Sequence, residues 1–456
     1  MPASLPSSTR PSLSPSTLRR TFGLAGPLLV GALATNLMGV IDTAMVGQLG
    51  TSALAGVGLA SQLFFLVLAL LLGIAAAVQA RVAQAVGAGQ WGLTGRLLNS
   101  GLVLAAGAAL LVIAFSYLLV PGLLAAIQSD AQVVVLGGDY LDTRLPSLLF
   151  LALNLSFRAY WVGVSQAIWS MITILVLSVA NVLFNYALIF GNFGAPALGA
   201  AGAGLGSTLA VALATLLNIV LAIWLARGRG FAQGLMPRHV LLDMLRVASP
   251  ESLRQLLFTA GVALSYVISG FMSTAELAAF YVMVNVSLLV YLPHIGFAGA
   301  ATTLTGEALG AGQHRDIGRR GWTVTAAGMV VMLGLAGLVW LHPHTVLELF
   351  SLQEAAVVWA VLPLQLIVLA HVLDGCGKIF AGAMIGIGAT SKALYLTLWP
   401  QWLLLLPGLA LAVYFGQGLD VAAWLFVGWG AITCLCFACA WLLWVGDDFA
   451  SASVTR

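Results

Sequence analysis

ALAGVGLASQLFFLVLALLLGIAAAVQ, residues 53–79, is a run of 27 residues without one charged side chain. An α-helix needs about 20 predominantly apolar residues to cross the hydrocarbon core of a bilayer, so this run is typical of a transmembrane helix. The whole chain shares its character, because 61% of the 456 residues are hydrophobic, 7% are charged and the mean hydropathy is +1.05. A soluble domain carries about a quarter charged residues. The composition excludes that class.

Apolar runs of similar length recur along the chain and predict an all-α polytopic membrane protein with twelve transmembrane helices. We expect them at about 22–46, 53–79, 97–120, 133–157, 167–191, 198–225, 249–270, 277–303, 321–342, 355–380, 392–415 and 420–444. Lys and Arg flank alternate connections between these runs. The remaining connections contain neither Lys nor Arg; they lie near 47–52, 121–132, 192–197, 271–276, 343–354 and 416–419. Because Lys and Arg mark the cytoplasmic side, we expect an even number of spans and both termini in the cytoplasm of a bacterial cell, with the protein in the inner membrane.

The same charge pattern predicts the domain organisation. Residues 1–20 are rich in Ser and Pro and are expected to be a disordered cytoplasmic terminus. An N-terminal lobe of six spans over 21–225 and a C-terminal lobe of six spans over 249–445 should follow. An arginine-containing cytoplasmic linker, 226–248, joins them, and 446–456 form a cytoplasmic tail.

An internal repeat with one fixed offset relates the two halves. Pro27 and Pro250 are 250 − 27 = 223 residues apart, and Gly87-Ala88-Gly89-Gln90 matches 310–313 residue for residue at the same spacing. The repeat superposes spans 1 and 2 on spans 7 and 8, so both halves enter the membrane in the same direction. Parallel repeats of this kind imply two pseudo-symmetric six-helix bundles with a site between them and a rocking mode of transport.

These features together resemble the multidrug and toxic compound extrusion (MATE) family. The likeness covers about residues 20–445. The residues that carry it are Pro27 with Ile-Asp-Thr-Ala-Met-Val-Gly-Gln-Leu-Gly at 41–50, both GAGQ sequences, Asn181-x-x-x-Asn185 and Gly199-x-x-Gly202-Ala203. Leu373-Asp374-Gly375 points to the DinF-like branch.

The resemblance implies a fold of two six-helix bundles around a central cavity. It also implies secondary active export of drugs or metabolites, often cationic and amphipathic, in exchange for protons or sodium ions by alternating access. A flippase for lipid-linked saccharides, from the same superfamily, is the alternative. An enzyme would need a catalytic cluster at one membrane depth, and the sequence shows none, so we expect a transporter.

Asp42 is the strongest candidate for a coupling residue, because a carboxylate within the hydrocarbon is costly, by about 3 kcal/mol on insertion scales, and is functional by default. Asp42 and Asn185 should lie at similar depth, in the outer halves of spans 1 and 5. Asn181 shares a helix face with Asn185, and Ser207 stands where the family often has Thr. Asn185 itself stands where family members often have Asp, which favours protons over sodium. A structural, helix-packing role for Asp42 is the alternative reading.

Asp374 is the second intramembrane acid, and the resemblance gives its position a role in cation binding. The glutamate that accompanies it in other branches is replaced here by Thr259. Lys378 follows one helical turn later, so an i,i+4 ion pair is an equal alternative. The repeat places Ser265 opposite Asp42, since 42 + 223 = 265.

Aromatic and Met side chains facing the cleft are expected to contact the drug, because such surfaces adapt to varied ligands. We predict Met38, Met45, Phe64, Phe65, Tyr266, Met283 and Tyr291 for this role.

Asp142 and Arg144, near the outer end of span 4, should pair or reach the interface. No motif predicts a cofactor, a metal site or a nucleic-acid partner. We expect a monomer whose partners are small molecules and membrane lipid.

Overall fold

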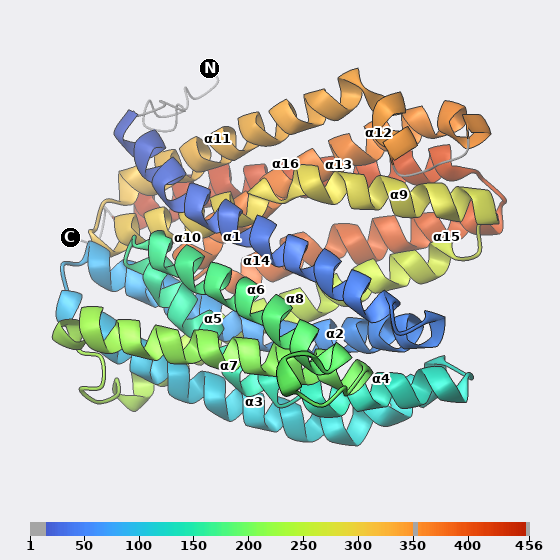
Figure 1. The fold of residues 1–456 in the computed structure, drawn as a ribbon. Helices are drawn as coiled ribbons and strands as arrows, with labels where there is room; N and C mark the ends of the chain where they lie inside the picture. Colours follow the sequence, from blue (N-terminus) through green and yellow to red (C-terminus); the bar gives the residue numbers. More distant parts are fainter. Residues whose placement is uncertain (1–14, 350–353, 453–456) are drawn as a thin grey trace, which may run out of the picture. The chain divides into compact units, whose positions relative to one another are not determined.

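The computed structural model describes residues 15–349 and 354–452, and every regular element in these ranges is a helix (Figure 1). A backbone in hydrocarbon must satisfy its hydrogen bonds within its own segment, which favours helices. In chain order they are α1 (Pro15–Gly47), α2 (Thr51–Gly87), α3 (Trp91–Ile127), α4 (Ala131–Arg144), α5 (Ser147–Gly163), α6 (Ala167–Phe190), α7 (Ala200–Leu225), α8 (Arg238–Ser269), α9 (Thr274–Tyr291), α10 (Pro293–Gly310), α11 (His314–Leu341), α12 (Pro343–Leu349), α13 (Glu354–Gly386), α14 (Thr390–Pro400), α15 (Leu406–Tyr414) and α16 (Leu419–Ala452).

Eleven helical segments of the described chain are long and apolar enough to cross a membrane. A twelfth span results when α4 and α5, bent by 51° at the short break between them, are taken together. Pro146 lies in this break, where its ring and missing N–H prevent a regular helix. The prediction of an all-α membrane protein with twelve spans is confirmed.

The two ends of the chain carry more helix than the sequence suggested. α1 begins at Pro15, before the end of the segment 1–20 that was expected to lack structure. Proline suits the first turn of a helix, where its missing N–H has no intrahelical acceptor to lose. α16 continues to Ala452, into the expected tail 446–456. Residues 1–14 and 453–456 lie outside the described ranges.

The chain divides into two compact units. Unit 2 is Val30–Leu256, and unit 1 combines Met1–Leu29 with Leu257–Arg456. The divisions fall inside α1 and α8, the two helices that the 223-residue repeat makes equivalent. The sequence placed the boundary between the lobes in the connection 226–248 and not inside a helix. That boundary stays a prediction.

Both GAGQ sequences form tight turns between helices, α2 to α3 and α10 to α11. Gly89 and Gly312 have positive φ angles of 71° and 67°. Glycine adopts this left-handed conformation without the steric cost that a Cβ would bring. The sequence repeat therefore marks a repeat of local structure.

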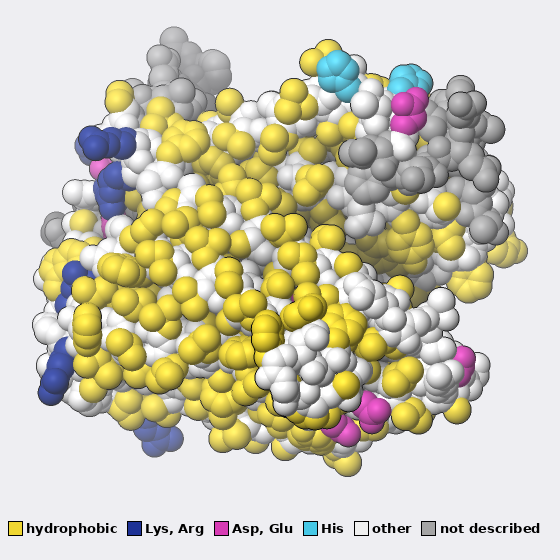
Figure 2. Space-filling model, viewed as in Figure 1, with side chains coloured by type: hydrophobic (Ala, Val, Ile, Leu, Met, Phe, Trp, Pro, Cys, Tyr) yellow, Lys and Arg dark blue, Asp and Glu magenta, His cyan; other side chains and the backbone are white. Residues whose placement is uncertain are grey.

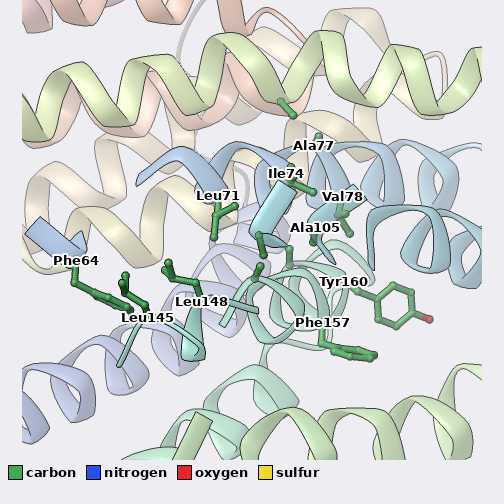
Figure 3. Packing of buried hydrophobic residues seen from close by; sticks show 14 of the residues in the cluster. Phe64, Leu71, Ile74, Ala77, Val78, Ala105, Leu145, Leu148, Phe157 and Tyr160 are labelled. Carbon is green, nitrogen blue, oxygen red and sulfur yellow. The ribbon is translucent and has the colours of Figure 1, made fainter. Parts of the chain in front are cut away.

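The core of unit 2 is a continuous cluster in which α2 packs against α3, α4 and α5 (Figure 3). Large side chains such as Phe64, Leu145 and Phe157 fill it. Small residues bring the helices close together, because dispersion contacts rather than water exclusion hold helices together in a bilayer. At Gly204 of α7, an added Cβ would lie 2.5 Å from the backbone oxygen of Tyr140 on α4. This contact fixes α7 against α4 beside the polar residues described below.

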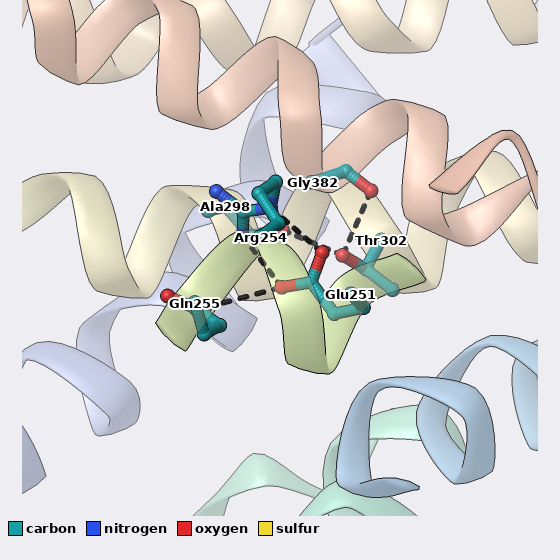
Figure 4. A network of polar contacts seen from close by, with 6 residues as sticks. All are labelled: Glu251, Arg254, Gln255, Ala298, Thr302 and Gly382. Carbon is teal, nitrogen blue, oxygen red and sulfur yellow. Dashed lines mark hydrogen bonds and ion pairs between the residues drawn. The ribbon is translucent and has the colours of Figure 1, made fainter. Parts of the chain in front are cut away.

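Buried polar contacts occur within each unit (Figure 4). In unit 1, the Thr302 hydroxyl of α10 donates to the backbone oxygen of Gly382 on α13 over 2.8 Å. In unit 2, Arg254 donates through Nε to Glu251 over 2.7 Å and through Nη2 to the second oxygen of the same carboxylate. Both side chains of this bidentate pair are buried. These groups satisfy one another, as buried polar groups must.

Hydrophobic side chains dominate the face of the molecule seen in Figure 2, and the charged side chains on that face lie at its margins. Large apolar side chains are widely exposed, among them Leu118 at 74% and Trp224 at 80%. Such exposure is expected of residues that face lipid tails, and it would be a liability in water.

Candidate functional site

Four of the predicted coupling residues come together in unit 2. Asp42 lies near the C-terminal end of α1, Asn181 and Asn185 lie one turn apart on α6, and Ser207 lies on α7. The Nδ2 atom of Asn185 donates to Asp42 Oδ1 over 2.8 Å. It also lies 3.3 Å from the side-chain oxygen of Asn181. The sequence placed Asp42 and Asn185 at similar depth and Asn181 on the same helix face as Asn185, and the structure joins Asp42 and Asn185 directly.

The Asn181 amide connects this acid to Ser207, and it can do so in two orientations. With its nitrogen toward Ser207, the amide donates to the Ser207 hydroxyl over 2.9 Å. Rotated by half a turn, its nitrogen donates to Asp42 Oδ1 over 2.7 Å and its oxygen accepts from Ser207 Oγ over 2.9 Å. The rotated form suits an ionised Asp42, which accepts hydrogen bonds and donates none. The first suits a protonated Asp42, whose hydroxyl can donate to the Asn181 oxygen.

The amides of this site are enclosed. Asn185 is fully buried and Asn181 and Ser207 are nearly so, whereas Asp42 is partly exposed. Gly206 of α7 makes room for the Asn185 side chain, because an added Cβ would lie 2.2 Å from its Oδ1. The neighbouring glycine thus positions the amide that holds the acid.

Arg144 is a component of this region whose role the sequence reasoning missed. It ends α4, and Thr208, next to Ser207, donates to the backbone oxygen of Thr143 over 2.8 Å. The guanidinium lies 4.7 Å from the centre of the Phe64 ring and interacts electrostatically with Asp42. Of the two alternatives expected for Asp142 and Arg144, the ion pair is not formed among the described residues, and Asp142 is exposed. The Nε and Nη1 atoms of Arg144 have no hydrogen-bond partner among the described residues. An arginine inside an apolar span was the signal that could have found it.

A second polar cluster surrounds Asp374 on α13 in unit 1. The Tyr291 hydroxyl at the end of α9 donates to Asp374 Oδ2 over 2.8 Å. The Lys378 ammonium lies 3.5 Å from the centre of the Phe258 ring on α8. Two histidines flank Tyr291, with ring centres 3.7 Å away for His294 and 5.4 Å away for His371.

Ser265, the repeat partner of Asp42, has no comparable role. Its hydroxyl donates to the backbone oxygen of Gly261, four residues earlier in its own helix, over 3.0 Å. A serine hydroxyl carries no negative charge and does not ionise at physiological pH, so it cannot take the part of a carboxylate in binding an exchangeable proton. The two halves are therefore chemically unequal at this position.

The predicted drug-contact residues occupy different environments. Met283 and Phe64 are buried in the packing of their units, and Met38 and Met45 are partly buried against apolar clusters. Phe65 is 55% exposed. Tyr266 stacks on Tyr281 with ring centres 5.4 Å apart. The structure brings one of the set, Tyr291, to a predicted coupling residue, a pairing that helix periodicity did not indicate. Drug contact stays a prediction for all seven.

Comparison with known proteins gives one consistent family. The MatE family model matches residues 27–187 and again 250–408. The two matches start 250 − 27 = 223 residues apart, the offset of the internal repeat. Together they cover more than half of the chain.

Relatives of nearly full length carry the name "Probable multidrug resistance protein NorM". That of Pseudomonas syringae pv. tomato is 30% identical over 437 residues, covering 91% of this chain and 92% of the relative. That of Thermotoga maritima is 25% identical over 426 residues, covering 90% and 89%. The assignment to the DinF-like branch stays a prediction.

Solved structures share the fold. A MATE transporter in its straight conformation matches with a TM-score of 0.85 at 19% identity, covering 99% of this chain and all of the other. A transporter of the MOP superfamily from Pyrococcus furiosus matches with a TM-score of 0.84 at 20% identity, covering 98% of this chain and 99% of the other. The doubled family match, the full-length relatives and the shared fold agree, and the expectation of a transporter rather than an enzyme is confirmed. The chain belongs to the MATE family of membrane transporters.

Proposed function

We propose that this protein is a secondary active exporter that exchanges small organic molecules, often cationic and amphipathic, for protons through Asp42. The observation that carries the proposal is the way in which Asp42 is held. Two buried acids, Glu251 and Glu307, have arginine partners in Arg254 and Arg20 respectively. Asp42 instead accepts its hydrogen bond from the neutral amide of Asn185.

This difference makes a change of charge easier at Asp42 than at Glu251 or Glu307. An arginine in direct contact holds a carboxylate ionised, because guanidinium stays protonated and its charge favours the anion. A neutral amide exerts no such force, and burial in a medium of low dielectric disfavours the charged form.

The donors around Asp42 favour protons over sodium. Sodium in transporters is coordinated by oxygen atoms, yet the atom of Asn185 that faces the carboxylate is the amide nitrogen. An N–H group directed at the carboxylate occupies the position of a metal ligand and repels a cation. A proton binds to the carboxylate directly and needs no set of coordinating oxygen atoms.

Exchange requires that the site open alternately to the two sides. Support comes from the parallel repeat, which favours rocking of two lobes, 21–225 and 249–445, joined by the linker 226–248. The relatives' names support multidrug cargo. We further propose that both termini lie in the cytoplasm, on the charge distribution of the loops, and that the protein is a monomer in the inner membrane of a bacterium.

The test is dye efflux from proteoliposomes of purified protein, with a pH gradient or a sodium gradient imposed in turn. We expect the pH gradient to drive export of a cationic dye and the sodium gradient to have no effect. Asp42→Asn should abolish export, and Asp139→Asn, at an exposed position, should leave it unchanged. Export by well-folded Asp42→Asn protein at the unmodified rate overturns the assignment of Asp42, and failure of both gradients overturns the exchange mechanism.

A further inference from the structure

Unit 1 contains a lysine deep within a membrane-spanning helix. Lys378 is 7% exposed and its ammonium lies against the face of the Phe258 ring. An ammonium in the hydrocarbon region is costly, so such residues face the protein interior and pair with other groups. The negative face of an aromatic ring attracts a cation but does not neutralise it. The charge of Lys378 therefore needs a balancing anion.

Asp374 is the carboxylate placed to supply it. It is 1% exposed, and its Oδ2 accepts from Tyr291. Its other oxygen, Oδ1, has no hydrogen-bond partner among the described residues. Asp374 and Lys378 are four residues apart on α13, so their side chains leave the same face of the helix with Cβ atoms about 6 Å apart. The flexible four-carbon stem of lysine spans that separation.

The titratable groups that pack around the pair do not replace Lys378. His294 and His371 direct Nδ1 at the backbone oxygens of Tyr291 and Ile367 respectively. A buried imidazole can remain neutral at physiological pH. Lys378 is therefore the side chain of this cluster best suited to balance a carboxylate.

We propose that Lys378 is the permanent counter-ion of Asp374 and that it excludes exchangeable cations from unit 1. It is then a residue that determines ion specificity by acting through Asp374. The inference rests on the proposed function in one respect, since it leaves Asp42 as the acid at which the exchanged cation binds. A contrast with unit 2 supports the inference. Lys378 stands one helical turn after Asp374, whereas the residues one turn before and after Asp42 on its own helix are the uncharged Met38 and Val46.

The test uses purified protein in detergent and measures thermal unfolding in sodium, potassium or choline chloride at equal ionic strength, at pH 6 and pH 8. The variants are Lys378→Met, Lys378→Arg, Asp374→Asn and the double variant Lys378→Met with Asp374→Asn. Lys392→Met, at an exposed position, is the matched control. Binding of radioactive sodium to each variant is measured in parallel.

We expect the unmodified protein, Lys378→Arg and Lys392→Met to unfold at the same temperature in all three salts and to bind no sodium. Lys378→Met leaves a buried carboxylate without its counter-ion, so its midpoint should fall by about 5–10 °C in choline chloride at pH 8. Sodium, or a proton at pH 6, should restore it, because either one neutralises the carboxylate. The double variant should regain stability without sodium, since the unbalanced charge is gone.

Equal destabilisation of Lys378→Met and the double variant would overturn the proposal, as would sodium binding to the unmodified protein that Asp374→Asn abolishes. Neither measurement involves transport. A protein that exports no dye can still show the coupling between Lys378 and Asp374, so failure of this inference and failure of the exchange mechanism are distinguishable.

Discussion

Asn185 holds Asp42 across 143 positions of sequence, with its amide nitrogen 2.8 Å from a carboxylate oxygen. The contact joins the C-terminal part of α1 to the C-terminal part of α6. Because of this contact, the charge of Asp42 depends on a neutral hydrogen-bond donor. Several variants test this dependence.

Replacing Asn185 by aspartate should move the pH dependence of efflux to more alkaline values. Two carboxylates at hydrogen-bond distance cannot both ionise easily, so the pair holds a proton to higher pH. The measurement is dye efflux from proteoliposomes between pH 5.5 and 8.5. Asn185→Leu, which removes the donor without adding charge, is the comparison. A profile that stays in place in Asn185→Asp would show that residue 185 has no influence on the coupling acid.

Gly206 should not tolerate a side chain. A Cβ there would lie 2.2 Å from Asn185 Oδ1 and 3.0 Å from the Asn185 backbone nitrogen. Overpacking of this kind typically costs about 1–3 kcal/mol, and displacement of the amide should lower proton-driven efflux by about tenfold or more. Gly58→Ala is the control, because nothing lies within 4 Å of a Cβ at that position. Full activity of Gly206→Ala would contradict the positioning role of this glycine.

Arg144 should tune the proton affinity of the same site. Its positive charge favours the ionised form of Asp42, so Arg144→Gln should leave Asp42 protonated up to higher pH and move the efflux profile in the alkaline direction. Arg144→Lys keeps the charge and should keep the profile, although it loses part of the contact with Phe64. The same series of pH values serves as the assay. An acid shift in Arg144→Gln would have the wrong sign and would rule out this electrostatic role.

The buried pair of Glu251 and Arg254 should contribute to stability and not to coupling. Arg254→Met leaves Glu251 buried without its guanidinium partner, which costs about 3–5 kcal/mol in comparable pairs. Adding Glu251→Gln to it should recover much of the lost stability. Thermal unfolding of the two variants measures both effects. If the double variant is no more stable than Arg254→Met, the charge of Glu251 is balanced by other groups.

Hydropathy and charge alone predicted most of the fold, because the bilayer allows few structures and the length of a span is fixed by its thickness. The association of Asp42 with Asn185 was also predictable, since depth within two helices that run in the same direction follows from counting residues. The 223-residue repeat was visible without coordinates for the same reason. It is a property of order along the chain.

Contacts that depend on rotation of one helix against another were not predictable. The hydrogen bond from Tyr291 to Asp374 was not foreseen. The contact of the Lys378 ammonium with the Phe258 ring was not expected either. Arg144 was expected to pair with Asp142 or to reach the interface, and its contact with Phe64 was not foreseen. These helices carry apolar residues on all sides, so the periodicity of the sequence does not indicate which face points inward.

Ser265 donates its hydroxyl to the backbone of its own helix, although the internal repeat makes its position equivalent to that of Asp42. A compound shaped to block the carboxylate and amides of the first half would meet no duplicate pocket of that chemistry in the second. Such a blocker should titrate the protein at one equivalent per polypeptide.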